Sequence, residues 1–454
     1  MHRISRLAVS SSLVLALAAG CAVKAGELGE LTQGSPGTGT GADSSGDADT
    51  GADTGILDPT NGEATEGSST GGAPGDSTTG GPPPSADGVD ILFVIDNSGS
   101  MAEEQQRLAA AITALVDPLI AAGRDLRIAV TTTDVGNPRC PATTPESGAF
   151  QTASCRARVA DGEWTYLDED LSAACLGVCS KDSLVFSPTT TAEDPDPKPR
   201  PWIEWDGATG NVDASLAQAL GCMLPQGVAG CGFEAPLEGV YRALARAQTP
   251  GDPQFGFLRD SADLLIVIVS DEADCSSNPD FADIFTTNKV FWSSPDDPAP
   301  TSAVCWHAGA QCTGGPGTYD DCVAVDRDDA GAITADPTQA VLQPLARYQE
   351  ALATIAADKL AAGSAATVRV AAISGVPVGY PQVPQVFADS ADPDTQQLYG
   401  IAPGCVTESG FAVPPLRIRE LVEQSAPLGA GLFSICEENF QSSLAAISGA
   451  LMGE

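Results

Sequence analysis

The sequence has few basic and few aromatic residues. Its 454 residues include 22 Lys and Arg against 60 Asp and Glu, the formal net charge is −38, and aromatic residues make up only 5%. A chain this acidic repels nucleic acid and anionic lipid headgroups, which argues against both as partners. Divalent cations and basic partners remain compatible with it, and the charge is equally consistent with simply keeping an exported protein soluble.

Histidine and the common catalytic motifs are also scarce. The only histidines are His2 and His307, and the chain contains no His-Glu-x-x-His, Gly-x-Ser-x-Gly or Gly-x-x-x-x-Gly-Lys-Ser/Thr pattern. Carboxylates are abundant, but no pattern places two of them together in a cleft. The sequence therefore predicts that the chain is not an enzyme.

The N-terminus has the organisation of an export signal. Positive charges at Arg3 and Arg6 precede an apolar run, Leu7–Ala19, which is too short to span a bilayer. We therefore expect residues 1–20 to be a signal peptide that directs the chain out of the cytoplasm. No other stretch is apolar over the length of a membrane-spanning helix.

The end of this signal, Leu17-Ala18-Ala19-Gly20-Cys21, resembles the lipobox of bacterial lipoproteins. The resemblance implies that Cys21 is lipidated and becomes the first residue of the mature chain. Ala18 departs from the pattern, which prefers leucine there, and an ordinary cleaved signal with a chance cysteine is the alternative. The lipobox predicts localisation in the cell envelope, at the outer membrane or cell surface, with the N-terminal lipid as the only membrane attachment.

Twelve cysteines remain after Cys21. In an exported chain an even number predicts up to six disulfides, whose connectivity the sequence does not determine. We expect one local bridge, between Cys222 and Cys231. No CxxC pair occurs and the mature chain has one histidine, which argues against a zinc site. The twelve are Cys140, Cys155, Cys175, Cys179, Cys222, Cys231, Cys275, Cys305, Cys312, Cys322, Cys405 and Cys436.

The composition of residues 21–88 predicts that this segment is a disordered acidic tether. The stretch is rich in Gly, Ser, Thr, Asp and Pro, and it has no aromatic residue. Eleven of its residues are acidic and one, Lys24, is basic. Such a segment buries too little apolar surface to offset chain entropy, and its self-repulsion would extend it.

From residue 89 to the C-terminus, apolar strands alternate with helical patterns. This alternation predicts an α/β fold with a doubly wound, mostly parallel, Rossmann-like sheet. Stretches 136–205 and 276–335 break the alternation, and we interpret them as disulfide-rich loop insertions, the first holding a short edge strand. The predicted strands are 90–95, 127–131, 264–269, 368–373 and 431–435, and the predicted helices are 102–116, 236–247, 341–359 and 439–451.

Oxygen-bearing side chains follow three of these strands. Asp96, Ser98 and Ser100 follow the first, Asp134 follows the second, and Asp271 follows the strand 264–269. Ligands of open α/β sheets bind at the carboxyl ends of the strands, so these side chains should meet there. Hydroxyl groups with few carboxylates suit Mg²⁺ or Mn²⁺ and leave the ion able to accept a carboxylate from a partner.

Asp96-x-Ser98-x-Ser100 after a hydrophobic strand, with Ser270-Asp271 ending a later one, resembles the metal-ion-dependent adhesion site of von Willebrand factor A (VWA) domains. The resemblance covers roughly residues 89–450. It implies a sheet of about six strands, a divalent ion, and protein or extracellular matrix ligands. Asp96, Ser98 and Ser100 match the first motif, and Asp271 matches the acidic residue that usually acts through water.

The VWA family also uses a threonine in a loop that corresponds here to residues 227–234, and Val228 stands where we expect it. Thr133, Asp134 or water could supply the missing oxygen. Two functions remain open. One is an envelope-anchored, metal-dependent adhesion or protein-binding module. The other is a metal-independent structural or assembly component of the envelope.

Overall fold

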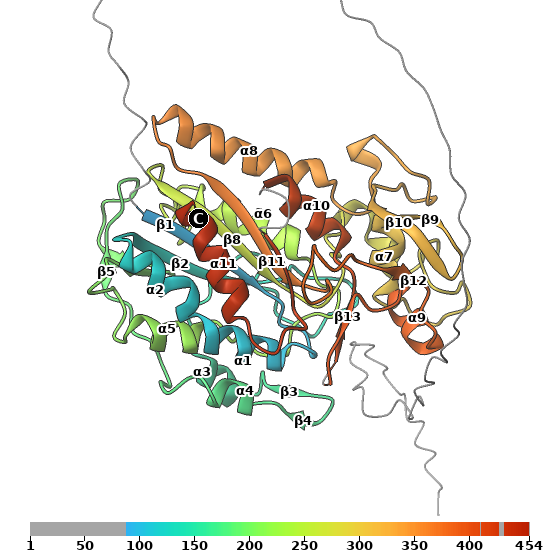
Figure 1. Cartoon of the computed structure of the whole chain (residues 1–454), viewed down its shortest axis with the longest axis horizontal. Coiled ribbons are helices and arrows are strands. Elements are labelled where there is room, and N and C mark those ends of the chain that lie inside the picture. The colour runs from blue at the N-terminus through green and yellow to red at the C-terminus, as the bar shows by residue number, and fades with distance from the viewer. Residues whose placement is uncertain (1–87, 409, 426–430, 454) are drawn as a thin grey trace, which may run out of the picture. The chain divides into compact units, whose positions relative to one another are not determined.

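The structure, a computed structural model, describes residues 88–408, 410–425 and 431–453 (Figure 1). The predicted signal peptide, the lipidation of Cys21 and the tether lie outside these residues. No helix within the described ranges is long and apolar enough to span a membrane.

The centre of the fold is a six-stranded sheet with the order β15-β11-β8-β1-β2-β7. Its strands are β1 (Gly88–Ile95), β2 (Asp125–Thr132), β7 (Ile203–Trp205), β8 (Ala262–Val269), β11 (Val368–Ser374) and β15 (Leu432–Ser434). All neighbours are parallel except β7, which pairs antiparallel with β2 at the edge. The predicted parallel sheet is present, and β7 is the short edge strand expected in the first insertion.

The order of these strands is that of a doubly wound sheet. Numbered along the chain, they lie in the order 3-2-1-4-5-6, so the winding reverses beside β1. β1 is in register with both neighbours, since Ile95 pairs with Thr132 of β2 and with Val269 of β8. The loops that follow these three strands therefore leave the sheet at the same level.

Helices cover both faces of the sheet (Figure 1). One face packs against α1 (Ala102–Ala111), α2 (Thr113–Ala121), α5 (Leu216–Met223) and α11 (Gln441–Met452), and the other against α6 (Pro236–Ala247), α8 (Leu345–Ala361) and α10 (Leu416–Ser425). Alternate residues of β1 point to opposite faces, so that Phe93 joins the first core and Leu92 the second. Burial on both faces explains why this strand is almost wholly apolar.

Two helix predictions need adjustment. The helix expected over 102–116 is two helices, α1 and α2, that meet at Ile112 and continue to Ala121. The helix expected from Val341 begins at Leu345, because Pro344 before it has an extended backbone (φ −58°, ψ 141°). α6 has the predicted bounds, Pro236–Ala247.

The two insertions contain short elements of their own. Within or beside them lie 3₁₀ helices at Pro279–Phe285 and Pro337–Gln339, and the hairpin of β13 and β14 follows near the end of the chain. The short elements are α3 (Cys155–Ala160), β3 (Thr165–Tyr166), β4 (Glu169–Asp170), α4 (Ala173–Leu176), β5 (Pro188–Thr189), β6 (Lys198–Pro199), α7 (Ala303–Gly309), β9 (Ala310–Gly314), β10 (Thr318–Ala324), β12 (Phe387–Ala388), α9 (Pro393–Tyr399), β13 (Cys405–Val406) and β14 (Phe411–Ala412).

All twelve cysteines form disulfides. The pairs are Cys140–Cys231, Cys155–Cys175, Cys179–Cys222, Cys275–Cys305, Cys312–Cys322 and Cys405–Cys436. The predicted Cys222–Cys231 bridge is wrong, because the two residues belong to different cores. Cys222, on α5, packs in an apolar cluster with Cys179, whereas Cys231 packs in another with Cys275. The close sulfurs of Cys155, Cys175 and Cys179 are all used by disulfides.

Candidate metal centre

The loop after β1 turns its side-chain oxygens inward. Asp96 is completely buried, and its Oδ1 accepts a hydrogen bond of 2.9 Å from the Ser98 backbone amide. The Ser98 and Ser100 hydroxyls lie 3.3 Å apart. The three side chains predicted to share one ion therefore lie together.

The end of β8 supplies the next group. The Ser270 hydroxyl donates a 2.7 Å hydrogen bond to Asp96 Oδ2, and the Asp96 amide donates to the Val269 carbonyl at 2.9 Å. Asp271, only 9% exposed, follows Ser270, and its Oδ1 is buried without a hydrogen-bond partner. The structure thus brings Asp271 to the Asp96 loop, as the register of β1 and β8 requires.

A further carboxylate, Glu234, was not foreseen as part of this cluster. It lies just before α6 and is completely buried, and its Oε2 accepts a hydrogen bond from the Thr133 hydroxyl at the end of β2. Its Oε1 has no hydrogen-bond partner. A sequence signal did exist, since Glu234 is the single acidic residue in the loop 227–234.

Val228 lies elsewhere. Its side chain is buried in an apolar cluster with Trp164 and Cys155. Its neighbour Gly227 is joined to the loop after β1 through Gln105 of α1. The Gln105 side-chain amide donates both to the Gly227 carbonyl at 2.8 Å and to the Asp96 carbonyl at 3.0 Å. Glu234, and not position 228, is where this loop presents oxygen to the cluster.

Asp134 has a supporting role in the structure. Its carboxylate accepts hydrogen bonds from the backbone amides of Gly136 (2.9 Å) and Cys231 (3.2 Å). Asp134 thereby fastens the loop that carries Glu234 to the end of β2. Of the two residues considered as substitutes for the missing threonine, Thr133 is the one that contacts Glu234.

The carboxyl groups of the cluster lie close to one another and have no basic side chain beside them among the described residues. Burial raises the pKa of Asp271 well above its usual range, and the neighbouring charges of Asp96 and Glu272 raise it further, while a hydrogen bond from Ser100 opposes them. Burial, Asp96 and Glu272 likewise raise the pKa of Glu234 well above normal. Burial also raises the pKa of Asp96. None of Asp96, Glu234 or Asp271 forms an ion pair with a basic side chain among the described residues.

The first insertion covers part of the Asp96 loop, which follows β1. A Cβ atom at position 99 would lie 2.3 Å from the ring of Tyr166 in β3, so the insertion requires glycine there. The 227–234 loop approaches equally closely, because a Cβ at Gly230 would lie 2.3 Å from Asn97 Oδ1. Both segments press against the Asp96 loop and hold its shape.

These residues fit a hard divalent cation. Carboxylate and hydroxyl oxygens are the ligands that Mg²⁺ and Mn²⁺ prefer, and two of the carboxylate oxygens lack any hydrogen-bond donor. A buried charge without a partner costs several kcal/mol of folding free energy. A cation among Asp96, Ser98, Ser100 and Asp271 would remove that cost.

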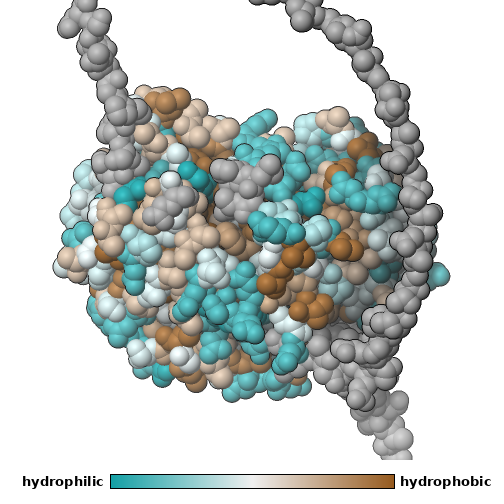
Figure 2. Space-filling model, in the orientation of Figure 1, coloured by the Kyte–Doolittle hydropathy of each residue, from teal (hydrophilic) through white to brown (hydrophobic). Residues whose placement is uncertain are grey.

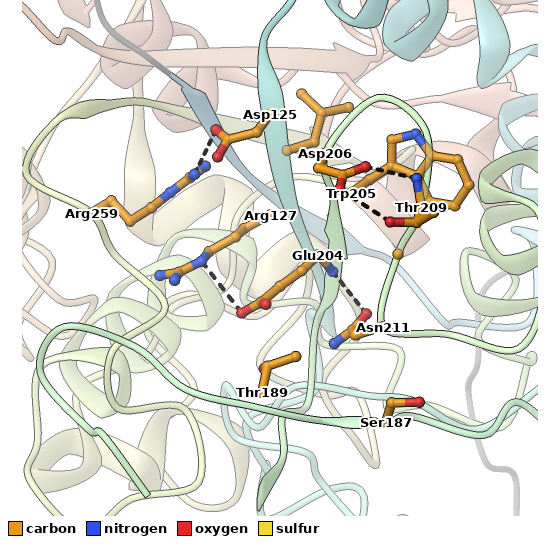
Figure 3. Close-up of a pocket in the computed structure, with 12 residues that line it drawn as sticks. Asp125, Arg127, Ser187, Thr189, Glu204, Trp205, Asp206, Thr209, Asn211 and Arg259 are labelled. Carbon is orange, nitrogen blue, oxygen red and sulfur yellow. Dashed lines mark hydrogen bonds and ion pairs between the residues drawn. The ribbon is translucent and has the colours of Figure 1, made fainter. Parts of the chain in front are cut away.

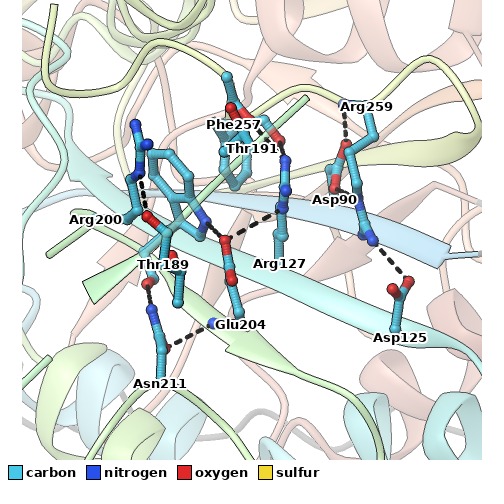
Figure 4. A network of polar contacts seen from close by, with 12 residues as sticks. Asp90, Asp125, Arg127, Thr189, Thr191, Arg200, Glu204, Asn211, Phe257 and Arg259 are labelled. Carbon is cyan, nitrogen blue, oxygen red and sulfur yellow. Dashed lines mark hydrogen bonds and ion pairs between the residues drawn. The ribbon is translucent and has the colours of Figure 1, made fainter. Parts of the chain in front are cut away.

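A hollow of about 370 Å³ lies at the other end of the sheet, where β2 begins (Figure 3). Its two arginines are already paired with carboxylates. Arg259 donates to Asp125 at 2.6 Å, and Arg127 lies 3.6 Å from Glu204 (Figure 3). The pairing extends inward to Asp90 on β1, which accepts a 2.7 Å hydrogen bond from Arg259 Nε (Figure 4). The unsatisfied charge therefore lies at the carboxyl ends of the strands and not in this hollow.

Comparisons with known proteins reveal only distant similarity. No protein-family model and no curated protein matches the chain. Two pilus adhesins of known structure align weakly. SpaC from Lactobacillus rhamnosus GG, in its open conformation, is 11% identical over 80% of this chain and 29% of its own, with a TM-score of 0.29. RrgA from Streptococcus pneumoniae is 10% identical over 81% of this chain and 44% of its own, also with a TM-score of 0.29. The chain thus spans less than half the length of either adhesin, and similarity of this degree assigns no ligand or role.

Proposed function

We propose that the chain is an envelope-anchored binding module of the VWA type whose adhesion to a protein or matrix ligand depends on Mg²⁺ or Mn²⁺. One observation carries the proposal. Two buried carboxylate oxygens, Asp271 Oδ1 and Glu234 Oε1, have no hydrogen-bond donor, and the largest neighbouring charge on both residues is Asp96, itself negative. A divalent cation is the partner that such a cluster lacks.

The sheet supports the assignment to the VWA type. The six strands and the reversal of winding beside β1 agree with the Rossmann-like sheet of about six strands that the resemblance implies. Asp96, Ser98 and Ser100 would hold the ion directly, and Asp271 would act through water. The ion would supply an electrophilic centre at the carboxyl edge of the sheet. The sequence contains none of the common catalytic motifs, and we propose a binding protein and not an enzyme.

The carboxyl edge also carries exposed apolar side chains. Val378 and Val386, in the loop after β11, are 54% and 63% exposed, and Val406 of β13 is 64% exposed. The two segments touch, since a Cβ at Gly404 would lie 2.0 Å from the Gly375 carbonyl oxygen. Figure 2 shows hydrophobic side chains interspersed with polar ones on the face that carries β13. Exposed apolar groups in these segments favour a protein partner.

The proposed anchor has a direct test. Replacing Cys21 by alanine should move the protein from the membrane fraction to the soluble fraction of the envelope, because one acyl-bearing cysteine is its only attachment. Fractionation of cells expressing each form, followed by immunoblotting, measures this. A Cys21→Ala protein that stays with the membranes contradicts the anchor.

The binding function can be tested with purified full-length protein on immobilised collagen, fibronectin and laminin. The wild type should bind at least one of them in Mn²⁺ and should lose that binding in chelator, and Asp96→Ala should not bind in either condition. Equal binding with ion and with chelator would favour the metal-independent structural role instead. Absence of binding to every surface would leave the adhesion proposal without a matrix ligand and contradict it for this class.

A further inference from the structure

Glu234 is held rigidly in the cluster. The backbone amides of Gly230 and Ala235, on either side of it, donate to the carbonyls of Asn97 (2.8 Å) and Thr133 (3.1 Å). Cys231 in the same loop is joined to Cys140 by a disulfide. These contacts tie the loop to the ends of both β1 and β2 and fix the backbone at Glu234, and the hydrogen bond from Thr133 orients its side chain.

The oxygens of Glu234 are not equivalent. Oε2 accepts the Thr133 hydrogen bond, whereas Oε1 is buried without a donor. A mere structural residue at this buried position could be a glutamine or a threonine, either of which would satisfy Thr133 without a buried charge. A buried carboxylate with one oxygen that lacks a donor points to a positively charged ligand of that oxygen.

We infer that Glu234 is a ligand of the divalent ion, in the place where the VWA family uses a neutral threonine. The inference rests on the proposed function, since it assumes that an ion is bound. A glutamate in place of a neutral threonine makes the ion site more negative. Asp96, Asp271 and Glu234 carry more negative charge than a divalent ion neutralises, and Glu272 beside them is also buried. The loaded site therefore stays negative, does not recruit a partner's carboxylate, and favours partners with basic or neutral groups.

The test measures the binding of Mn²⁺ to the full-length protein through the relaxation of water protons. Two variants are compared with the wild type: Glu234→Gln keeps the size of the side chain, and Glu234→Thr restores the residue of the family. Both should bind Mn²⁺ at least about tenfold more weakly. Both should also show a larger relaxation enhancement per bound ion, because water occupies the vacated position.

Acetate serves as the probe for a partner's carboxylate. It should reduce the enhancement in Glu234→Thr, where it displaces water, and leave the wild type unchanged. Asp329→Asn, an exposed acidic position in the second insertion, is the matched control and should behave as the wild type. Melting in chelator reports folding, and Glu234→Gln should melt no lower than the wild type there.

The outcomes separate the two proposals. Wild type and Glu234 variants with the same affinity and the same enhancement would overturn the role of Glu234 while leaving the metal site intact. Displacement of wild-type water by acetate would overturn the closed, negative character of the site. A wild type that binds no Mn²⁺ would overturn the proposed function, and this inference with it.

Discussion

Replacing Asp271 by asparagine should stabilise the ion-free protein and reduce the further stabilisation that the ion provides. Without an ion, the buried Asp271 carboxylate lies near the like charge of Asp96 and forms no ion pair among the described residues, and an uncompensated buried charge costs several kcal/mol. Asparagine removes the charge and keeps the shape. With the ion, wild type gains about 2.7 kcal/mol at a concentration 100 times the dissociation constant, and a variant that binds tenfold more weakly gains about 1.4 kcal/mol less.

Thermal melting in chelator and in excess Mn²⁺ measures both effects, with Asp329→Asn as the control that should change neither. The pH adds a second check. A carboxyl group whose pKa is raised on folding destabilises the fold as the pH rises above the usual carboxyl range, so the ion-free advantage of Asp271→Asn should grow with rising pH until the carboxyl group of the folded protein is ionised. A variant that melts lower than wild type in both conditions would mean that Asp271 has only a structural role.

Replacing Arg259 by alanine should destabilise the fold by about 3–5 kcal/mol, because it leaves the carboxylate of Asp90 buried and without its ionic partner. Asp90 lies on the central strand β1 and is completely buried. Its Oδ1 would lose the hydrogen bond from Arg259 Nε, and only the 2.7 Å bond from the Arg259 backbone amide to Oδ2 would remain (Figure 4). Equilibrium unfolding in urea, with the disulfides intact, measures the loss.

Asp125→Asn provides the control for this pair. Its side chain is 51% exposed and contacts the same guanidinium, so its loss should cost less than about 1 kcal/mol. Burial already raises the pKa of Asp90, and Arg259 is the largest influence that lowers it. Without Arg259 the pKa rises further, so the destabilisation should shrink as the pH falls and Asp90 binds a proton. If Arg259→Ala lowers the free energy of unfolding by less than about 1 kcal/mol at pH 8, this account of the Asp90–Arg259 pair is contradicted.

Much of the sheet could be predicted because its strands are buried on both faces. A run such as Leu264–Val269 has no polar residue, and this pattern is specific for a central parallel strand. The positions of Asp96, Ser98 and Ser100 followed from the same logic, since loops at the carboxyl ends of neighbouring strands meet. The register of Ile95 with Val269 then brings Asp271 to the same place.

Glu234 and the disulfides could not be derived in this way. Whether Glu234 or Val228 faces the cluster depends on the path of an irregular loop, and that path is set by contacts from Asn97, Thr133 and Asp134. Cysteine pairing likewise depends on which apolar cluster each cysteine enters. The ion pair of Asp90 could not be predicted for another reason. Its partner Arg259 is far away in the sequence, and a single charge in an apolar strand does not indicate which residue neutralises it.

The central claim, that Asp96 and its neighbours hold a divalent ion, is tested most directly by calorimetry. Mg²⁺ and Mn²⁺ are titrated into chelator-treated full-length wild type and into Asp96→Ala. We predict saturable binding by the wild type and none by the variant, since Asp96 accepts hydrogen bonds from Ser98 and Ser270 and is the largest neighbouring charge on both Glu234 and Asp271. Absence of saturable binding in the wild type, or equal binding by both proteins, would contradict the claim.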